Sequence, residues 1–234
     1  MAKPWITLDR IDTEEGELEL RQRGEKDFLI TVGGLVLMNS LSNRSEVVLG
    51  QLGSRHLGRH PAPRVLLGGL GMGFTLRAVL DCLPATGQVV LAELNPTVVE
   101  WCRGPLALLT DSAVDDSRVT IEICDVAALV RGCAQGSFDA VVFDLYKGPH
   151  YRTDKTSDPL YGSKAINKVR TCLKPEGLFT VWGENYDEGF EQRLRAAGFA
   201  TRCERPGRGG YRHVVFVARK PVDKAARGSD ANLG

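Results

Sequence analysis

Apolar residues in the first forty positions alternate with polar residues or form short runs, and glycines separate these segments. Short alternating segments bounded by glycine are typical of antiparallel β-strands joined by hairpin turns. The pattern therefore predicts a small N-terminal β meander. Its predicted strands are residues 5–11, 18–23, 28–32 and 35–38.

Beyond residue 44 the pattern changes, and short apolar runs alternate with segments of helical spacing. This alternation predicts an α/β fold with a doubly wound, Rossmann-like parallel sheet, and the two consecutive strands at its end indicate an antiparallel C-terminal strand. The predicted strands are residues 65–67, 89–92, 119–123, 140–143, 178–181, 200–203 and 213–217. The predicted helices lie near residues 45–57, 74–80, 126–130, 161–173 and 188–197, and a further helix opens at Asn95-Pro96.

The chain has 234 residues, enough for one sizeable hydrophobic core. We expect residues 1–45 to form the β-hairpin region and residues 46–220 the Rossmann-like domain. Residues 221–234 are polar and are expected to be a disordered tail.

A glycine-rich loop, Gly68-Gly69-Leu70-Gly71-Met72-Gly73, joins the first parallel strand to its helix. Glycines let the backbone turn tightly and approach a ligand, with the helix N-terminus behind it. Glu93 ends the next strand, where a carboxylate accepts ribose hydroxyls. These features predict a nucleoside site. Its expected residues are Gly68, Gly69, Gly71, Gly73, Glu93 and the adjacent Leu94.

The spacing of the glycines distinguishes two classes of cofactor. A dinucleotide fingerprint reads G-x-G-x-x-G/A, but Phe74 occupies the sixth position when counting starts at Gly69. The tighter spacing suits S-adenosylmethionine, which has no pyrophosphate. We therefore predict an S-adenosylmethionine site and disfavour a nicotinamide dehydrogenase.

Two further acids, Asp125 and Asp144, follow the third and fourth parallel strands. Ligands of open α/β sheets bind at the carboxyl ends of the strands, so these acids are expected to meet Glu93 there. Asp125 is expected to accept a hydrogen bond from the adenine amino group, with Val126 against the ring, or else to cap the next helix.

Asp144 is the expected catalytic residue, orienting the acceptor or taking its proton, and also part of the cofactor site. The loops after the fourth and fifth strands carry aromatic and polar side chains suited to an acceptor pocket. Trp182 among them is equally suited to the core. The expected acceptor residues are Tyr146, His150, Tyr151, Trp182 and Glu184.

The chain carries 30 Lys+Arg and 29 Asp+Glu, a net charge of +1. This balance argues against a partner such as nucleic acid or an anionic membrane, and no apolar run approaches the roughly 18 residues of a membrane span. The neutrality hides an asymmetry. Residues 1–40 have five basic and eight acidic side chains, so this part is net acidic. Residues 201–234 have eight basic and three acidic side chains, so this part is net basic.

The six cysteines are scattered and show no metal-ligand spacing. Free cysteines fit a reducing, cytoplasmic location, and we expect no metal. His56 and His60 are four residues apart, but Pro61 ends that helix and no third ligand is near.

Several segments resemble the spermidine synthase-like branch of the class I methyltransferase fold, over about residues 5–220. The resemblance implies this fold, a donor that is S-adenosylmethionine or its decarboxylated form, and a possible homodimer paired through the N-terminal hairpins. The matching segments are the hairpins, Ser45-Glu46, residues 65–73, Glu93, Cys124-Asp125 and residues 138–144.

The chain departs from the aminopropyltransferases of this family at their acids. The first loop of those enzymes resembles G-G-G-D-G-G, and this chain has Gly71 at the position of the acid. They also carry a D-x-x-D pair after the fourth strand. Here Asp144 matches the first acid of that pair, and Lys147 replaces the second. Their Tyr-(Gln/His)-Glu element matches only at Glu46. Polyamines require carboxylates, whereas Gly71 leaves room for the carboxylate of intact S-adenosylmethionine.

We therefore predict an S-adenosylmethionine-dependent transferase acting on a small molecule, most simply a methyltransferase. The first alternative is a polyamine aminopropyltransferase that uses decarboxylated S-adenosylmethionine, with an acidic pocket rebuilt from Asp144, Asp158, Glu184 and Asp187. Transfer or cyclisation of the three-carbon arm is a further alternative, and a non-catalytic nucleoside-binding protein is the last. The acceptor itself is not identified by the sequence.

Overall fold

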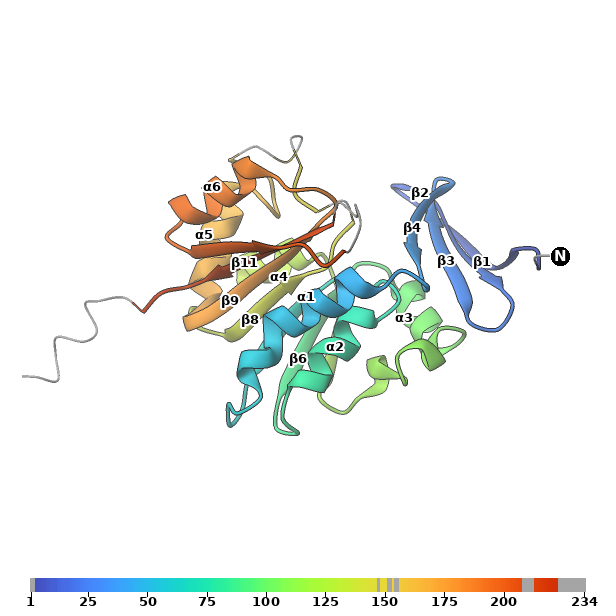
Figure 1. The fold of residues 1–234 in the computed structure, drawn as a ribbon, viewed down its shortest axis with the longest axis horizontal. Helices are drawn as coiled ribbons and strands as arrows, with labels where there is room; N and C mark the ends of the chain where they lie inside the picture. Colours follow the sequence, from blue (N-terminus) through green and yellow to red (C-terminus); the bar gives the residue numbers. More distant parts are fainter. Residues whose placement is uncertain (1–2, 147, 151–152, 154–155, 208–212, 223–234) are drawn as a thin grey trace, which may run out of the picture.

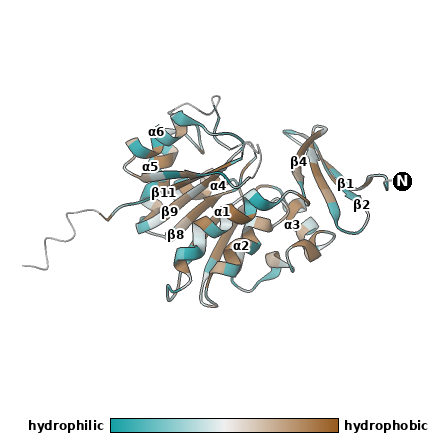
Figure 2. Cartoon of the chain, in the orientation of Figure 1, coloured by the Kyte–Doolittle hydropathy of each residue, from teal (hydrophilic) through white to brown (hydrophobic). Residues whose placement is uncertain are grey.

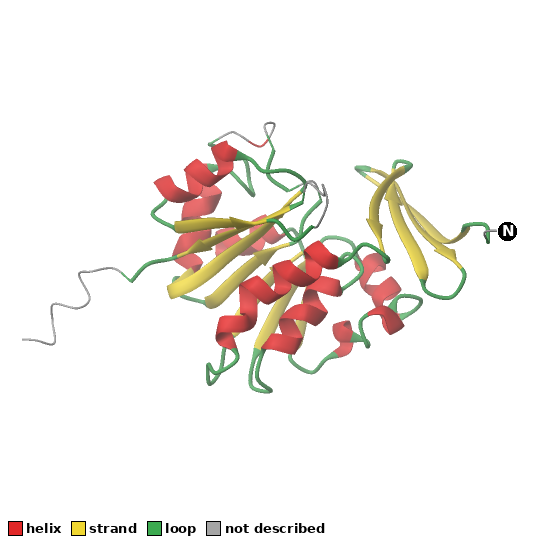
Figure 3. Ribbon diagram, in the orientation of Figure 1, coloured by secondary structure: helices red, strands yellow, loops and turns green. Residues whose placement is uncertain are grey.

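The N-terminal strands form a separate antiparallel sheet (Figures 1 and 3) in the computed structural model, which describes residues 3–146, 148–150, 153, 156–207 and 213–222. Its strand order is β1-β2-β3-β4, as the predicted meander requires. One face is apolar and buried, because Leu18, Leu20, Phe28 and Ile30 alternate with polar residues along β2 and β3. The strands are β1 (Ile6–Thr13), β2 (Gly16–Arg23), β3 (Asp27–Val32) and β4 (Leu35–Asn39).

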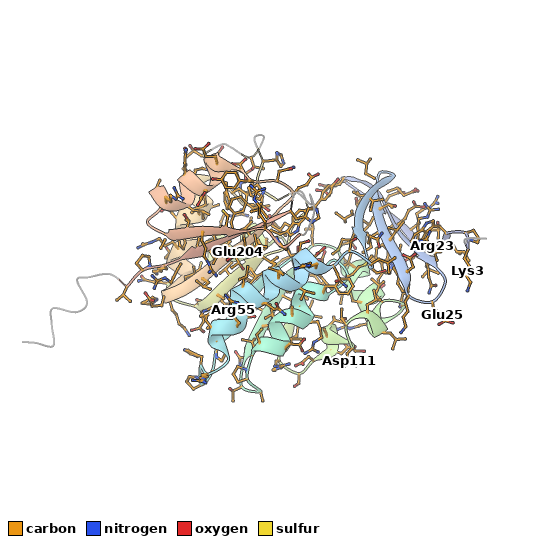
Figure 4. The ribbon with its side chains drawn as sticks, viewed as in Figure 1. Lys3, Arg23, Glu25, Arg55, Asp111 and Glu204 are labelled. Atoms are coloured by element: carbon orange, nitrogen blue, oxygen red, sulfur yellow. The ribbon has the colours of Figure 1, made fainter. Side chains whose placement is uncertain are left out.

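This small sheet stands beside the main domain. Its contact includes a hydrogen bond in which Trp101 Nε1 donates to Asp9 Oδ2 at 2.7 Å. Lys3, Arg23 and Glu25 lie at the end of the sheet farthest from the main domain (Figure 4). The chain leaves β4 and enters α1 (Arg44–Ser54), so the small sheet places the first turn of this helix.

A seven-stranded sheet forms the centre of the main domain, in the order β10-β11-β9-β8-β5-β6-β7. Its first five strands along the chain are parallel, and β11 pairs antiparallel with both β9 and β10. This confirms the predicted α/β fold with an antiparallel C-terminal strand. The strands are β5 (Arg64–Gly68), β6 (Gln88–Glu93), β7 (Val119–Ile123), β8 (Phe138–Phe143), β9 (Leu173–Gly183), β10 (Ala200–Glu204) and β11 (Val214–Arg219).

Helices cover both faces of this sheet, and alternate strand residues pack against each face. Leu67 and Val142 face α1 and α2, whereas Leu66 and Phe143 belong to the core beneath α4, α5 and α6. The strands between these layers are apolar along their length, as buried parallel strands should be (Figure 2). The remaining helices are α2 (Phe74–Cys82), α3 (Pro96–Arg103), α4 (Val126–Gly132), α5 (Ser163–Cys172) and α6 (Glu188–Ala196).

Several element boundaries differ from the sequence prediction, and two of these differences are informative. The helical segment after Ser45 ends as α1 at Ser54 and continues as a 3-10 turn over Arg55–Leu57, so His56 and His60 do not share a helix. Strand β9 begins at Leu173, five residues earlier than residue 178. Leu173 pairs with Phe138 of β8, a long-range contact. The segment Lys174-Pro175-Glu176-Gly177 after it reads as a turn, so the sequence alone does not predict a strand there.

None of the helices in the described part of the chain is both long and apolar enough to cross a membrane.

Candidate functional site

The carboxyl ends of β5, β6, β7 and β8 lie along one edge of the sheet, because these strands are parallel. The first turn of α1 and the start of β11 lie at the same edge, since β11 is antiparallel to β9 and Val214 pairs with Gly183 at the strand's end (Figure 1). The predicted site residues come from loops at this edge.

The loop after β5 depends on its glycines. Gly69, Gly71 and Gly73 have φ values of +88°, +53° and +83°, in the left-handed region that favours glycine. A Cβ on Gly69 would collide with the backbone carbonyl of Asp144. Gly73 lies at the N-cap of α2, so the loop delivers the chain directly to a helix N-terminus.

Glu93 is buried and ties the glycine-rich loop to the end of β6. Its Oε2 accepts from the Leu70 N–H at 2.8 Å and its Oε1 from the Asn95 N–H at 2.9 Å. Burial raises the pKa of Glu93, and these backbone donors act in the opposite direction. A carboxylate oxygen has two lone pairs, so each oxygen retains one for a ribose hydroxyl.

Asp125 occupies a helix N-cap. It is exposed, and its Oδ1 accepts from the Ala127 N–H at 2.8 Å, which is the capping role that the sequence left open. Val126 is buried beneath Gly68 and packs in the core. The exposed apolar side chains beside the loop are instead Leu94 and Ile123, which are 70% and 50% exposed.

Asp144 lies beside the glycine-rich loop, because its N–H donates to the Gly68 carbonyl at 2.9 Å. Its carboxylate is half-buried, and Oδ2 accepts a hydrogen bond from Thr75 Oγ1 at 2.6 Å. Burial and then the negative charge of Glu46 raise the pKa of Asp144 to about 7, while the Thr75 bond lowers it. Asp144 can therefore gain or lose a proton near neutral pH.

Glu46 brings further polar groups to this edge from the first turn of α1. Ser45 Oγ donates to Glu46 Oε2 at 2.7 Å and lies 3.0 Å from His213 Nδ1. The His213 ring meets the Trp182 ring edge-on, with centroids 4.9 Å apart. Trp182 is half-buried against the core, and its Nε1 is buried without a partner among the described residues.

Tyr161 lies near both Asp158 and Asp144. Tyr161 is buried, and its hydroxyl has no hydrogen-bond partner in the described part of the chain. Burial, and then the charges of Asp158 and Asp144, raise the pKa of Tyr161. Asp158 Oδ1 accepts from the N–H groups of Leu160 and Tyr161, which turns the chain into α5.

The other predicted acceptor residues are less enclosed. Tyr146 and Glu184 are exposed, and the backbone of His150 closes a turn with Thr153. Tyr151 and Lys147 lie outside the described residues. Asp187, an acid of the alternative pocket, caps α6 by accepting from the Phe190 N–H at 2.6 Å.

The space beside Gly71 is not empty. The Met38 thioether, from β4, lies where a Cβ on Gly71 would be. The expectation that Gly71 leaves room for a donor carboxylate stays a prediction, and it requires the flexible end of Met38 to move aside.

Sequence reasoning missed several residues at this edge. Of these residues, Thr75 is the one that the sequence could have indicated. A threonine in the first turn of the helix after a glycine-rich loop lies close to the ends of the neighbouring strands. Met38, Tyr161 and His213 reach the site through tertiary contacts. Nothing in their local sequence marks them.

Two other features of the described residues lie outside this site. A groove of about 760 Å³ lies mainly toward the amino ends of the strands and extends along β7 to Cys124; Arg64, Gln88, Arg118 and Phe138 are among its lining residues. No group of three or more His, Cys, Asp or Glu residues in the described chain is arranged to hold a metal ion.

Comparisons with known proteins give a consistent result. The profile of the spermine/spermidine synthase domain matches residues 51–191. The polyamine aminopropyltransferase of Clostridium tetani is 29% identical over 182 residues, which cover 76% of this chain and 60% of that protein. Putrescine N-methyltransferase 4 of Nicotiana tabacum is 29% identical over 136 residues, covering 55% of this chain and 32% of that protein. The chain thus spans 60% of the length of the first relative and about a third of the second.

The fold is also that of a solved spermidine synthase in complex with the transition state analogue AdoDATO. The TM-score is 0.69 at 22% identity, and the match covers 93% of this chain and 74% of that chain.

Proposed function

Because the chain belongs to the spermine/spermidine synthase family, we propose that it is a polyamine aminopropyltransferase that uses decarboxylated S-adenosylmethionine as donor. This was the alternative in our sequence prediction, and the comparisons favour it over methyl transfer. The named activity of the Clostridium tetani relative supports it.

The observation that carries the proposal is the pair of carboxylates at Asp144 and Glu46. Thr75 bonds to Asp144 and Ser45 bonds to Glu46, and neither carboxylate has a cationic partner in the described part of the chain. Glu46 raises the pKa of Asp144, and two carboxylates this close together favour a bound cation. An acceptor ammonium supplies that charge.

Asp158 adds a third acid nearby, since it and Asp144 both act on the Tyr161 hydroxyl. In the sequence prediction, the loss of two family acids disfavours a polyamine acceptor and a decarboxylated donor. Asp158 provides a carboxylate that offsets one of the missing acids, and Glu46 is an acid of the family pattern that this chain retains.

The reaction requires an unprotonated amine. Asp144 takes one proton from the acceptor ammonium, which leaves a lone pair on nitrogen. That nitrogen attacks the carbon of the aminopropyl arm next to sulfur, the C–S bond breaks, and its electron pair remains on sulfur in methylthioadenosine. The glycine-rich loop and Glu93 hold the nucleoside, and alignment of the two reactants supplies much of the acceleration.

Methyl transfer from S-adenosylmethionine to an amine is the second candidate. The acid missing at Gly71 and the similarity to a putrescine N-methyltransferase both favour it. Both candidates have an amine as acceptor.

Mass spectrometry distinguishes the two. The protein is incubated with 1,4-diaminobutane and either donor, and the nucleoside product is identified. Methylthioadenosine together with an aminopropylated amine is the expected result. S-adenosylhomocysteine would establish methyl transfer instead, and turnover with neither donor would contradict both candidates.

A further inference from the structure

A row of hydrogen bonds joins the first turn of α1 to the start of β11. Ser45 Oγ lies 2.7 Å from Glu46 Oε2 and 3.0 Å from His213 Nδ1. Ser45 and Glu46 are buried and His213 is half-buried. The row comes from segments 168 positions apart in the sequence, so it exists only in the folded chain.

The chemistry of the row fixes the state of the histidine. An ionised carboxylate only accepts hydrogen bonds, and a serine hydroxyl has a single proton to donate. Ser45 gives that proton to Glu46, so it can only accept from His213. The imidazole must therefore carry its proton on Nδ1, and when it is neutral its Nε2 has a lone pair.

The Nε2 atom is available to a ligand. The structure gives it no hydrogen bond with a described residue, and it is not among the buried polar atoms without partners. The row ends in a carboxylate, so its aligned dipoles increase the negative potential at Nε2. Such an atom accepts well from a cationic N–H donor.

His213 also lies at the sheet edge that carries the candidate site. It directly precedes Val214, which pairs with Gly183 at the end of β9, and its ring packs against Trp182. Glu46, at the other end of the row, is close enough to Asp144 to influence that carboxyl group. The row therefore connects His213 to the place where the reacting amine is expected.

We propose that His213 is a specificity-determining residue of the acceptor site, whose Nε2 accepts a hydrogen bond from the second ammonium group of a diamine. This rests on the proposed function, in which Asp144 receives the reacting amine. The Ser45 hydroxyl is the positioning group, because it selects the tautomer that exposes the Nε2 lone pair.

Calorimetry with two amines tests the inference in the full chain. The probes are 1,4-diaminobutane and 1-aminobutane, which share the reacting amine but differ at the far end. We expect the unaltered protein to prefer the diamine, and His213→Asn to reduce that preference about tenfold, the scale of a hydrogen bond to a charged group. Asparagine places its amide near the Nδ1 position and has nothing at Nε2.

His213→Gln is the matched control, because its longer amide reaches the Nε2 position and presents an oxygen there. It should retain part of the preference. Methylthioadenosine should bind all three proteins equally. A purely structural role would instead weaken both amines alike and leave their ratio unchanged in His213→Asn, which would overturn the inference.

The tautomer provides a readout that does not depend on activity. Nitrogen-15 chemical shifts should show His213 protonated at Nδ1, and Ser45→Ala should shift it toward the Nε2-protonated form. Protonation at Nε2 in the unaltered protein would also overturn the inference. If the unaltered protein binds neither amine, the proposed function itself fails, whereas diamine binding that is indifferent to residue 213 removes the inference alone.

Discussion

Thr75 Oγ1 lies 2.6 Å from Asp144 Oδ2 and 3.2 Å from the backbone carbonyl of Glu46. The hydroxyl has one proton, so it can serve only one of these acceptors at a time. When Asp144 is ionised, Thr75 donates to it. When Asp144 is protonated, the carboxyl can donate to Thr75, and Thr75 turns its proton to the Glu46 carbonyl. Thr75 can therefore keep a hydrogen bond with Asp144 Oδ2 in both protonation states, which suits a group that exchanges protons during catalysis.

The first prediction concerns the pH dependence of catalysis. Burial and Glu46 raise the pKa of Asp144 to about 7, so the ionised form that accepts a proton accumulates as pH rises through 7. Asp144→Asn should lower kcat/KM by about 10² to 10⁴-fold above pH 7. The measurement is kcat/KM of both proteins as a function of pH, in the range where the amine substrate is mostly an ammonium ion. In the unaltered enzyme kcat/KM should rise about tenfold per pH unit below pH 7 and level off above it. In Asp144→Asn, which must use the small fraction of free amine, kcat/KM should keep rising above pH 7, and the same pH profile in both proteins would rule out Asp144 as the base.

The second prediction concerns stability without ligands. In the folded protein the pKa of Asp144 is raised from its ordinary value of 3.8 to about 7. Between about pH 4 and pH 7, the folded state therefore keeps a proton that the unfolded state has lost. The contribution of this group to stability is therefore complete below pH 4 and is lost as pH rises through 7. Urea denaturation at several pH values measures the free energy of unfolding of Asp144→Asn and of the unaltered protein. As pH rises over this range, the value for Asp144→Asn should increase relative to that for the unaltered protein. A parallel pH dependence for the two proteins would contradict the raised pKa.

The third prediction uses the two neighbours of Asp144, which act on it in opposite directions. Glu46→Gln removes a negative charge and should move the kcat/KM profile to lower pH, since Ser45 can still donate to the amide oxygen. Thr75→Val removes the hydrogen bond that lowers the pKa of Asp144 and should move the profile to higher pH. Thr75→Ser keeps the hydroxyl and serves as the control. Shifts of the same sign in Glu46→Gln and Thr75→Val would show that these contacts do not set the pKa.

Local sequence patterns were sufficient for the elements of this fold but not for all of its site. Strand β7 and the helix that starts after Asn95 follow directly from apolar spacing and from a proline in the first turn. Glu93 and Asp144 were identifiable because parallel strands bring their carboxyl ends to one edge. Their ligand roles remain predictions.

The partners of these residues were not identifiable. His213 reaches Ser45 across 168 positions, and Met38 reaches Gly71 from a different sheet. No periodicity encodes such contacts, because they depend on how whole elements pack. The capping role of Asp125 shows the reverse case, in which a local hydrogen bond to Ala127 accounts for an acid that also lies at the site's edge.

The last prediction compares two glycines of the loop. Gly69 and Gly71 both have positive φ, so alanine strains the backbone at either position by about 1–2 kcal/mol. The neighbours differ, because a Cβ at Gly69 meets the Asp144 backbone whereas a Cβ at Gly71 meets the flexible end of Met38. We expect Gly69→Ala to abolish binding of methylthioadenosine and to lower Tm more than Gly71→Ala does. Gly71→Ala should weaken binding of methylthioadenosine, and adding Met38→Ala should restore it. Met38→Ala should not restore binding to Gly69→Ala. If Met38→Ala restored binding equally in both glycine variants, Met38 would not occupy the space beside Gly71.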